Sequence, residues 1–165
     1  MNKVLYIILI SLFSLTVFSC SDDKEEYSAT GTTDDTTTTD DTTTCDSTVS
    51  FVAVGPDGTI LTSSDNGISW CSRTSGTSQS LFGITYGNST FVAVGANGTM
   101  LTSTDNTSWT TTGSGISNTL WGVIYGKSAF VVVGQTGTIL TSSDGSSWTS
   151  RSSGTSSHLE DVISN

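Results

Sequence analysis

The amino-acid sequence predicts an all-β domain of three repeats, each folded as a four-stranded, propeller-like blade, so that the repeats form a partial or small β-propeller. The first observation is a stretch that begins at Phe51 (FVAVGPDGTILTSSDNGISW) and returns with small changes at Phe91 and at Phe130. The copies start 40 and then 39 residues apart, and a period near 40 that holds several strand-like runs is typical of propeller blades. The second observation is that no stretch beyond the N-terminal signal has the periodicity of a helix.

Residues 1–19 have the form of an export signal. Lys3 supplies a positive charge, and the apolar run that follows it is shorter than the roughly 20 residues that span a bilayer. Where the run ends, Ser19-Cys20 resembles the cleavage and acylation site of bacterial lipoprotein signals. The resemblance implies that lipidated Cys20 becomes the new N-terminus and anchors the chain to the bacterial outer membrane, facing the cell surface or the periplasm. A plain secretory signal is the alternative.

Residues 20–47 form a low-complexity linker rich in Thr and Asp (TGTTDDTTTTDDTTT), with too few apolar residues to offset the entropy cost of ordering. We expect this lipidated linker to be disordered and to tether the repeat domain, residues 48–165. The linker holds nine acids and one lysine, whereas the repeat domain holds six acids and three basic residues. Because the domain has no basic stripe, nucleic acid is not expected as a partner, and the membrane is reached only through the lipid anchor.

Turn residues divide each repeat into strands. The GPDG that starts at Gly55 is a turn sequence, because proline pre-sets one dihedral and glycine accepts a positive φ, and GANG and GQTG stand at the same point in the later copies. A second shared piece, LFGITYG from Leu81, returns as LWGVIYG from Leu120 and more loosely as LEDVIS from Leu159. The strands expected in the first unit are Phe51–Val54, Thr59–Ser63, one opened by Trp70, and a fourth at Leu81–Tyr86.

A serine, an aspartate and a tryptophan recur in the turn after the second strand of each copy. In the first copy, Ser63-x-Asp65-x-Gly67-x-x-Trp70 resembles the Asp-box of the sialidase-like and photosystem II assembly-factor-like propellers, and the resemblance of the repeats covers residues 51–165. It implies a structural role, because carboxylate and hydroxyl oxygens accept the N–H groups that a tight turn leaves unpaired; metal binding or catalysis is the lesser alternative. The later boxes are one residue shorter and consist of Ser103, Asp105 and Trp109, and of Ser142, Asp144, Gly145 and Trp148.

Four residues of the repeats are candidate ligand contacts. Phe82 and Trp121 occupy the same position in LFG and LWG and are possible stacking platforms for a sugar, although packing within the blade is the more usual role of such aromatic residues. Arg73 and Arg151 each stand three residues after a box tryptophan. They would either form a weak anion-binding patch or be solvated separately.

The repeat domain has little that points to catalysis. Similarity to a sialidase would imply an arginine cluster, a Tyr-Glu nucleophile pair and an aspartate that acts as the acid. In the repeat domain, Glu160 and Asp161 are the only adjacent acidic residues. Because neighbours on a strand point to opposite faces, these two side chains cannot flank one glycosidic bond together while the chain is extended. His158, the only histidine, has no second His or Cys near it in sequence and is expected at the surface. We therefore expect no enzyme, cofactor or metal site, and predict a binding module for a protein or glycan. The alternatives are a sialidase-type glycoside hydrolase and a truncated propeller remnant that no longer folds.

Cys45 and Cys71 remain once Cys20 is lipidated. An even number of cysteines in an exported chain predicts a disulfide between them. An unstrained bridge that closes a loop of this length would contribute about 3 kcal/mol and would fix the linker to the first blade.

The two ends of the repeat array complement each other. No LxGIxYG strand precedes Phe51, while Leu159–Ile163 supplies such a strand without the rest of its blade. The arrangement resembles the closure of propellers in which the last strand completes the first blade. Because closed propellers have about four to eight blades, we predict either a strained closed monomer or, in preference, a homodimer formed by strand exchange with six blades in all.

Overall fold

The computed structural model describes Thr48 and residues 51–165. The predicted signal peptide, the predicted linker with its expected lipidation site Cys20, and Cys45 lie outside the described residues. Within the described part, no helix is both long enough and apolar enough to cross a membrane.

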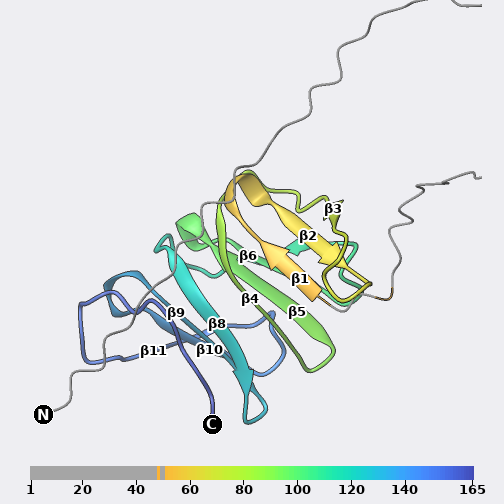
Figure 1. Ribbon diagram of the computed structural model, residues 1–165. Helices are drawn as coiled ribbons and strands as arrows, with labels where there is room; N and C mark the ends of the chain where they lie inside the picture. The colour runs from red at the N-terminus through yellow and green to blue at the C-terminus, as the bar shows by residue number, and fades with distance from the viewer. Residues whose placement is uncertain (1–47, 49–50) are drawn as a thin grey trace, which may run out of the picture. The chain divides into compact units, whose positions relative to one another are not determined.

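The described residues fold into three antiparallel sheets (Figure 1), so the predicted all-β architecture of propeller-like blades is confirmed. The strand orders are β1-β2-β3, β4-β5-β6-β7 and β8-β9-β10-β11, and a one-turn 3-10 segment stands between the hairpin strands of each repeat. The strands are β1 Phe51–Val54, β2 Ile60–Ser63, β3 Cys71–Arg73, β4 Leu81–Gly87, β5 Thr90–Gly95, β6 Met100–Ser103, β7 Thr110–Thr111, β8 Leu120–Gly126, β9 Ala129–Gly134, β10 Ile139–Ser142 and β11 Thr149–Arg151. The 3-10 segments are η1 Pro56–Gly58, η2 Ala96–Gly98 and η3 Gln135–Gly137.

The hydrogen-bond ladders group the strands differently from the units read in the sequence. The LFGITYG strand, β4, pairs with β5, so it is the first strand of the second sheet and not the fourth strand of the first sheet. β8 pairs with β9 in the same way. These pairings arise because two-residue loops, Asn88-Ser89 and Lys127-Ser128, connect the paired strands. The positive φ values of both loops suit the tight type I′ turn. The first sheet has three strands among the described residues, which agrees with the lack of an LxGIxYG strand before Phe51.

The 3-10 segments occupy the turns expected between the first two strands of each copy. In η2, Asn97 and Gly98 have φ values of 53° and 67°. Steric restriction also requires glycine at position 98, because a Cβ there would lie 1.9 Å from the carbonyl oxygen of Ile116. Asp57 and Thr136 hold the position of Asn97 in the other two sheets, with φ values of 53° and 58°.

Two apolar clusters fill the spaces between the sheets. β5 divides its side chains between them, because neighbouring residues of a strand point to opposite faces: Ala93 faces the first sheet, while Val92 and Val94 face the third. Burial on both faces explains why these strands read as continuous apolar runs. The cluster toward the first sheet contains Ile60, Leu81, Ala93 and Leu101, and the cluster toward the third contains Val92, Val94, Met100, Leu120, Phe130, Val132 and Leu140.

Leu159–Asn165 lies along β8 in extended form without being assigned as a strand. The Leu159 N–H donates to the Gly134 carbonyl at 3.0 Å, as the Leu81 N–H does to the Gly55 carbonyl at 2.9 Å. A Cβ on Gly122 of β8 would lie 3.0 Å from the Cα of Asp161. The segment therefore lies against the third sheet as β4 lies against the first, although no described strand pairs with it.

Candidate functional site

Asp65 holds the turn that follows β2. The Ser63 hydroxyl donates to Asp65 Oδ1 at 2.8 Å, and the Ser69 N–H and hydroxyl donate to the same carboxylate at 2.9 Å and 2.6 Å. The indole N–H of Trp70 donates to the Gly67 carbonyl at 3.1 Å. These bonds pair donors that the turn would otherwise leave to water.

The turns after β6 and β10 use the same chemistry with one residue fewer. Asp105 and Asp144 each accept from the serine two positions earlier and from the N–H groups two and three positions later, at 2.8 to 3.0 Å. The second box lacks a glycine because Asn106 takes the left-handed conformation (φ 57°) in which the third box has Gly145 (φ 77°). Asparagine is among the residues that tolerate this conformation best.

Hydrogen bonding lowers the pKa of all three box aspartates. The Ser69 hydroxyl, followed by the Ser69 N–H, lowers the pKa of Asp65 from 3.8 to about 2. The Ser108 N–H is the largest cause for Asp105 and the Ser147 N–H for Asp144, and each holds the pKa of its carboxyl well below the usual range. The three carboxylates are therefore charged at neutral pH, and their lone pairs are engaged within their own turns.

A different group of four side chains lines a hollow of about 400 Å³: Phe82, Trp121, His158 and Glu160. Phe82 comes from β4 and Trp121 from β8, which lie side by side. The ring centroids are 4.7 Å apart and the planes are tilted by 35°. Phe82 is 44% exposed, so the aromatic pair combines mutual packing with an accessible surface. The structure thus brings together the two aromatic residues that the sequence marks as candidate contacts.

Glu160 continues the row that Phe82 and Trp121 begin. It is the second residue of the LEDVIS segment, as the two aromatic residues are the second residues of LFG and LWG. The repeat alignment therefore contained the signal for this placement. The sequence reasoning missed it because it treated Glu160 as half of an acidic pair with Asp161 and not as a member of the aligned row.

His158 also lines this hollow. The backbone N–H of Thr136 donates to His158 Nδ1 at 3.1 Å, so the proton of the neutral imidazole is placed on Nε2. The hollow thus offers two aromatic surfaces, an imidazole and one carboxylate, and its rings and carboxylate suit a group with an apolar body and a cationic or N–H-bearing end. Within the described residues, no group of three or more His, Cys, Asp and Glu side chains is placed to hold a metal ion.

Arg73 and Arg151 are not brought together. Arg73 lies on β3 of the first sheet and Arg151 on β11 of the third, with the second sheet between them. The guanidinium Nε of each donates at 2.9 Å to a threonine hydroxyl on the neighbouring strand, Thr62 or Thr141. The same repeat position thus gives them the same local partner and not a shared anion-binding patch.

Cys71, on β3, is disulfide-bonded. It is the only cysteine among the described residues, so its partner lies outside them. The pairing with Cys45 stays a prediction.

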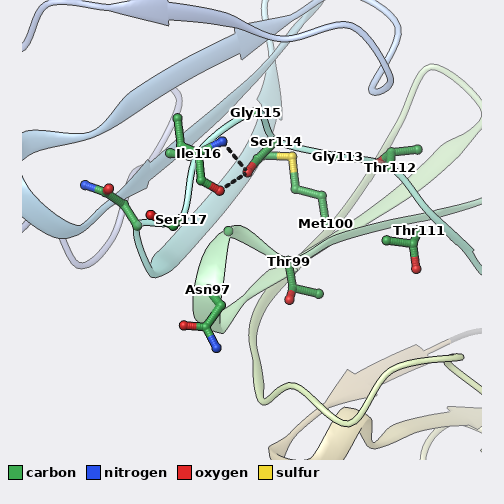
Figure 2. A pocket seen from close by; sticks show the side chains of 12 residues that line it. Asn97, Thr99, Met100, Thr111, Thr112, Gly113, Ser114, Gly115, Ile116 and Ser117 are labelled. Atoms are coloured by element: carbon green, nitrogen blue, oxygen red, sulfur yellow. Dashed lines mark hydrogen bonds between the residues drawn. The ribbon is translucent and has the colours of Figure 1, made fainter.

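A wider hollow of about 730 Å³ lies between η2 and the loop that follows β7 (Figure 2). The Ser114 hydroxyl donates to the Ile116 carbonyl at 3.0 Å and accepts from the Ile116 N–H at 3.3 Å, which shapes the loop (Figure 2). The first sheet has a similar hollow of about 470 Å³, where Ser75 bonds to Thr77 in the same way. Because this hollow recurs and no charged or aromatic side chain lines it in the second sheet, it is a feature of the blade and not the candidate site.

Comparison with solved structures supports the blade architecture. The structure of YCF48 bound to D1 peptide has a TM-score of 0.53 and 20% sequence identity, over 60% of this chain and 34% of that chain. The structure of YCF48 from Cyanidioschyzon merolae has a TM-score of 0.51 and 21% identity, over 60% of this chain and 32% of that chain. The present chain thus matches about a third of the length of these proteins, and at this identity the likeness shows the fold.

No protein-family model matches the chain, and no curated protein matches it.

Proposed function

We propose that the chain is a non-enzymatic binding module that presents the Phe82–Trp121–His158–Glu160 hollow to a protein partner. The observation that carries the proposal is the contact of two aromatic rings at 4.7 Å in a hollow that also contains a carboxylate and an imidazole. A YCF48 structure holds a bound D1 peptide, which supports peptide binding as a use of this kind of fold. No reaction is assigned to the site.

The partner chemistry that best fits the hollow is an extended peptide segment with a Lys or Arg side chain. A cation over an aromatic face contributes about 0.5–1 kcal/mol when exposed and about 2 kcal/mol or more when desolvated. Glu160 supplies the counter-charge, and acids outnumber basic residues by six to three across residues 48–165. The aliphatic stem of the side chain would lie on the rings of Phe82 and Trp121.

A glycan is the second candidate ligand, because the exposed ring of Phe82 also offers a flat surface for sugar stacking. The two candidate ligands differ in whether they need the negative charge of Glu160. Removal of the Glu160 charge should weaken a basic peptide strongly and a neutral sugar much less.

The test is binding of the full chain to an array of peptides in which one central position is Lys, Arg or Gln, beside an array of neutral glycans. We expect the Lys and Arg peptides to bind, and Trp121→Ala and Glu160→Gln each to weaken them about tenfold. Trp70→Ala is the matched control, because Trp70 is an aromatic residue outside the hollow with 42% exposure. Equal binding of Lys and Gln peptides, or equal loss with Trp70→Ala, would contradict the peptide proposal. Turnover of a sialoside by the purified chain would contradict the non-enzymatic one.

The module is further proposed to act at the bacterial outer membrane through a lipid on Cys20. The support is the sequence pattern of a short apolar core that ends in Ser19-Cys20, followed by a polar linker. We expect Cys20→Ala to move the chain from the membrane fraction to the soluble exported fraction. A Cys20→Ala chain that still partitions into detergent would place the anchor elsewhere.

A further inference from the structure

Within the described part, the first sheet and the C-terminal segment are each incomplete, and they are complementary. β1 pairs with β2 on one side, and no described residue pairs with it on the other side, where the second and third sheets have β4 and β8. Leu159–Asn165 lies along β8 in the place of the first strand of a further sheet, and no described strand pairs with it. Among residues 48 and 51–165, one sheet therefore lacks a first strand, and one segment in the position of a first strand lacks a sheet.

The same two ends expose apolar side chains. Phe51 is 50% exposed, whereas Phe130, at the same repeat position, is 0% exposed against the second sheet. At the opposite end, Val131, Val162 and Ile163 line a hollow of about 310 Å³, and Ile163 is 85% exposed. Joining the two ends would remove both apolar surfaces from water.

The space around Gly55 is independent evidence that a strand is missing beside β1. A Cβ at Gly95 would lie 2.1 Å from the Ser80 carbonyl oxygen, and one at Gly134 would lie 2.3 Å from the Thr119 carbonyl oxygen, because the first strand of each sheet passes close to these glycines. At Gly55 no carbonyl oxygen lies within 4 Å of such a Cβ, the nearest heavy atom is the Thr59 Cβ at 3.6 Å, and the φ of −163° is extended backbone that any residue adopts. Nothing among the described residues requires glycine at position 55. A first strand placed there as β4 and β8 are placed would require it.

We propose that Leu159–Asn165 of one chain pairs with β1 and completes the first sheet of a second copy. The same segment of the second copy completes the first sheet of the first chain. Each chain contributes one three-stranded and two four-stranded sheets, so the exchange gives a symmetric pair with six four-stranded sheets. The open edge of β1 and the C-terminal segment then pair with each other. The β8–β9 ladder fixes the register: because Tyr125 pairs with Phe130, Ser164 lies opposite Phe51 of the other copy.

Disulfide trapping tests this register. In a two-residue hairpin the pair next to the turn is hydrogen-bonded, so Tyr125 and Phe130 form the following non-hydrogen-bonded pair, with Cα atoms about 4.5 Å apart and in disulfide range. Two full-length forms with tags of different size, one Phe51→Cys and one Ser164→Cys, are co-expressed and oxidised. We expect a covalent pair with one chain of each size. Val52→Cys replaces Phe51→Cys in the control and should give about fivefold less product, because its side chain points to the other face.

Several results would overturn the exchange. One is the absence of a linked pair, and another is an equal yield from the Val52→Cys control. The third comes from a single chain that carries both Phe51→Cys and Ser164→Cys: a link within that chain would place both edges in one molecule. If the chain with both introduced cysteines formed a ladder of covalent species larger than a pair, that result would likewise contradict a closed pair.

Gly55→Ala separates the assembly from the fold. The added methyl group should lower the yield of the linked pair about tenfold, because it meets the incoming strand, and should leave the melting temperature of the single chain within about 2 °C. Gly134→Ala is the matched control and should destabilise the single chain itself, since its clash lies within the chain. An unchanged yield of linked pair with Gly55→Ala would also overturn the proposal.

Discussion

The first and third sheets have nearly the same sequence and different surroundings. Phe51 and Phe130 stand at the same repeat position, yet the first is 50% exposed and the second 0% exposed. The second sheet covers Phe130, and no described sheet precedes Phe51. The repeat sequence therefore determines the strand, whereas the preceding sheet determines its burial, as expected where each repeat contacts only its neighbours.

Truncation of the two phenylalanines should give the largest difference between the sheets. We expect Phe130→Ala to lower the free energy of unfolding by about 3–5 kcal/mol, since it leaves a cavity in the core, and Phe51→Ala to lower it by less than about 1.5 kcal/mol. Urea unfolding of both variants in the Gly55→Ala background compares them as single chains. A loss for Phe51→Ala as large as that for Phe130→Ala would show that Phe51 is covered.

The next largest expected difference in stability concerns a backbone N–H group that the second sheet has and the first sheet lacks. The Ala96 N–H donates to the Ser80 carbonyl at 2.9 Å, and Pro56, at the same position of the first sheet, has no N–H to donate. Ala96→Pro should destabilise the chain by about 1–3 kcal/mol because it leaves the Ser80 carbonyl unpaired. Pro56→Ala should change stability by less than about 1 kcal/mol. Chemical unfolding that gives equal effects for both variants would contradict this account.

Much of the fold could be predicted from the sequence because its signals are local. The repeat period, the GPDG-type turns and the absence of helical periodicity indicated β blades and the turn positions. The grouping of strands into sheets was less accessible. Whether Leu81–Gly87 pairs with the strand before or after it depends on the Asn88-Ser89 turn. The sequence reading counted this strand as the fourth of its own unit, yet in comparing the two ends of the array it assigned such a strand to the repeat that follows it.

The candidate site was only partly accessible from the sequence. Phe82 and Trp121 share a repeat position, so their alignment predicted similar places in successive sheets. That their rings touch depends on β4 and β8 lying side by side, and this is a tertiary contact. The bond from the Thr136 N–H to His158 joins residues far apart in sequence, and no motif marks it.

The η turns allow a smaller comparison between the first and third sheets. Asp57 and Thr136 hold equivalent positions at φ values of 53° and 58°. A β-branched residue is strained in this left-handed conformation, whereas Asn and Asp tolerate it. We expect Thr136→Asn to raise the free energy of unfolding by about 1 kcal/mol, and Asp57→Asn to change it by less than about 0.5 kcal/mol. Calorimetry that shows no gain for Thr136→Asn would mean that the turn relieves the strain in another way.

The smallest expected difference concerns acid stability of the box turns. The pKa of Asp65 is lowered to about 2 in the folded chain, so its stabilising contribution is complete above the unfolded value of 3.8 and is lost as the pH falls through about 2. The Ser69 hydroxyl is the largest cause for Asp65, whereas the Ser147 N–H is the largest for Asp144. Ser69→Ala should therefore raise the pKa of Asp65 and reduce the fall in melting temperature between about pH 4 and pH 2. Ser147→Ala keeps its backbone N–H and should leave that fall unchanged, so equal curves for both variants would contradict this assignment.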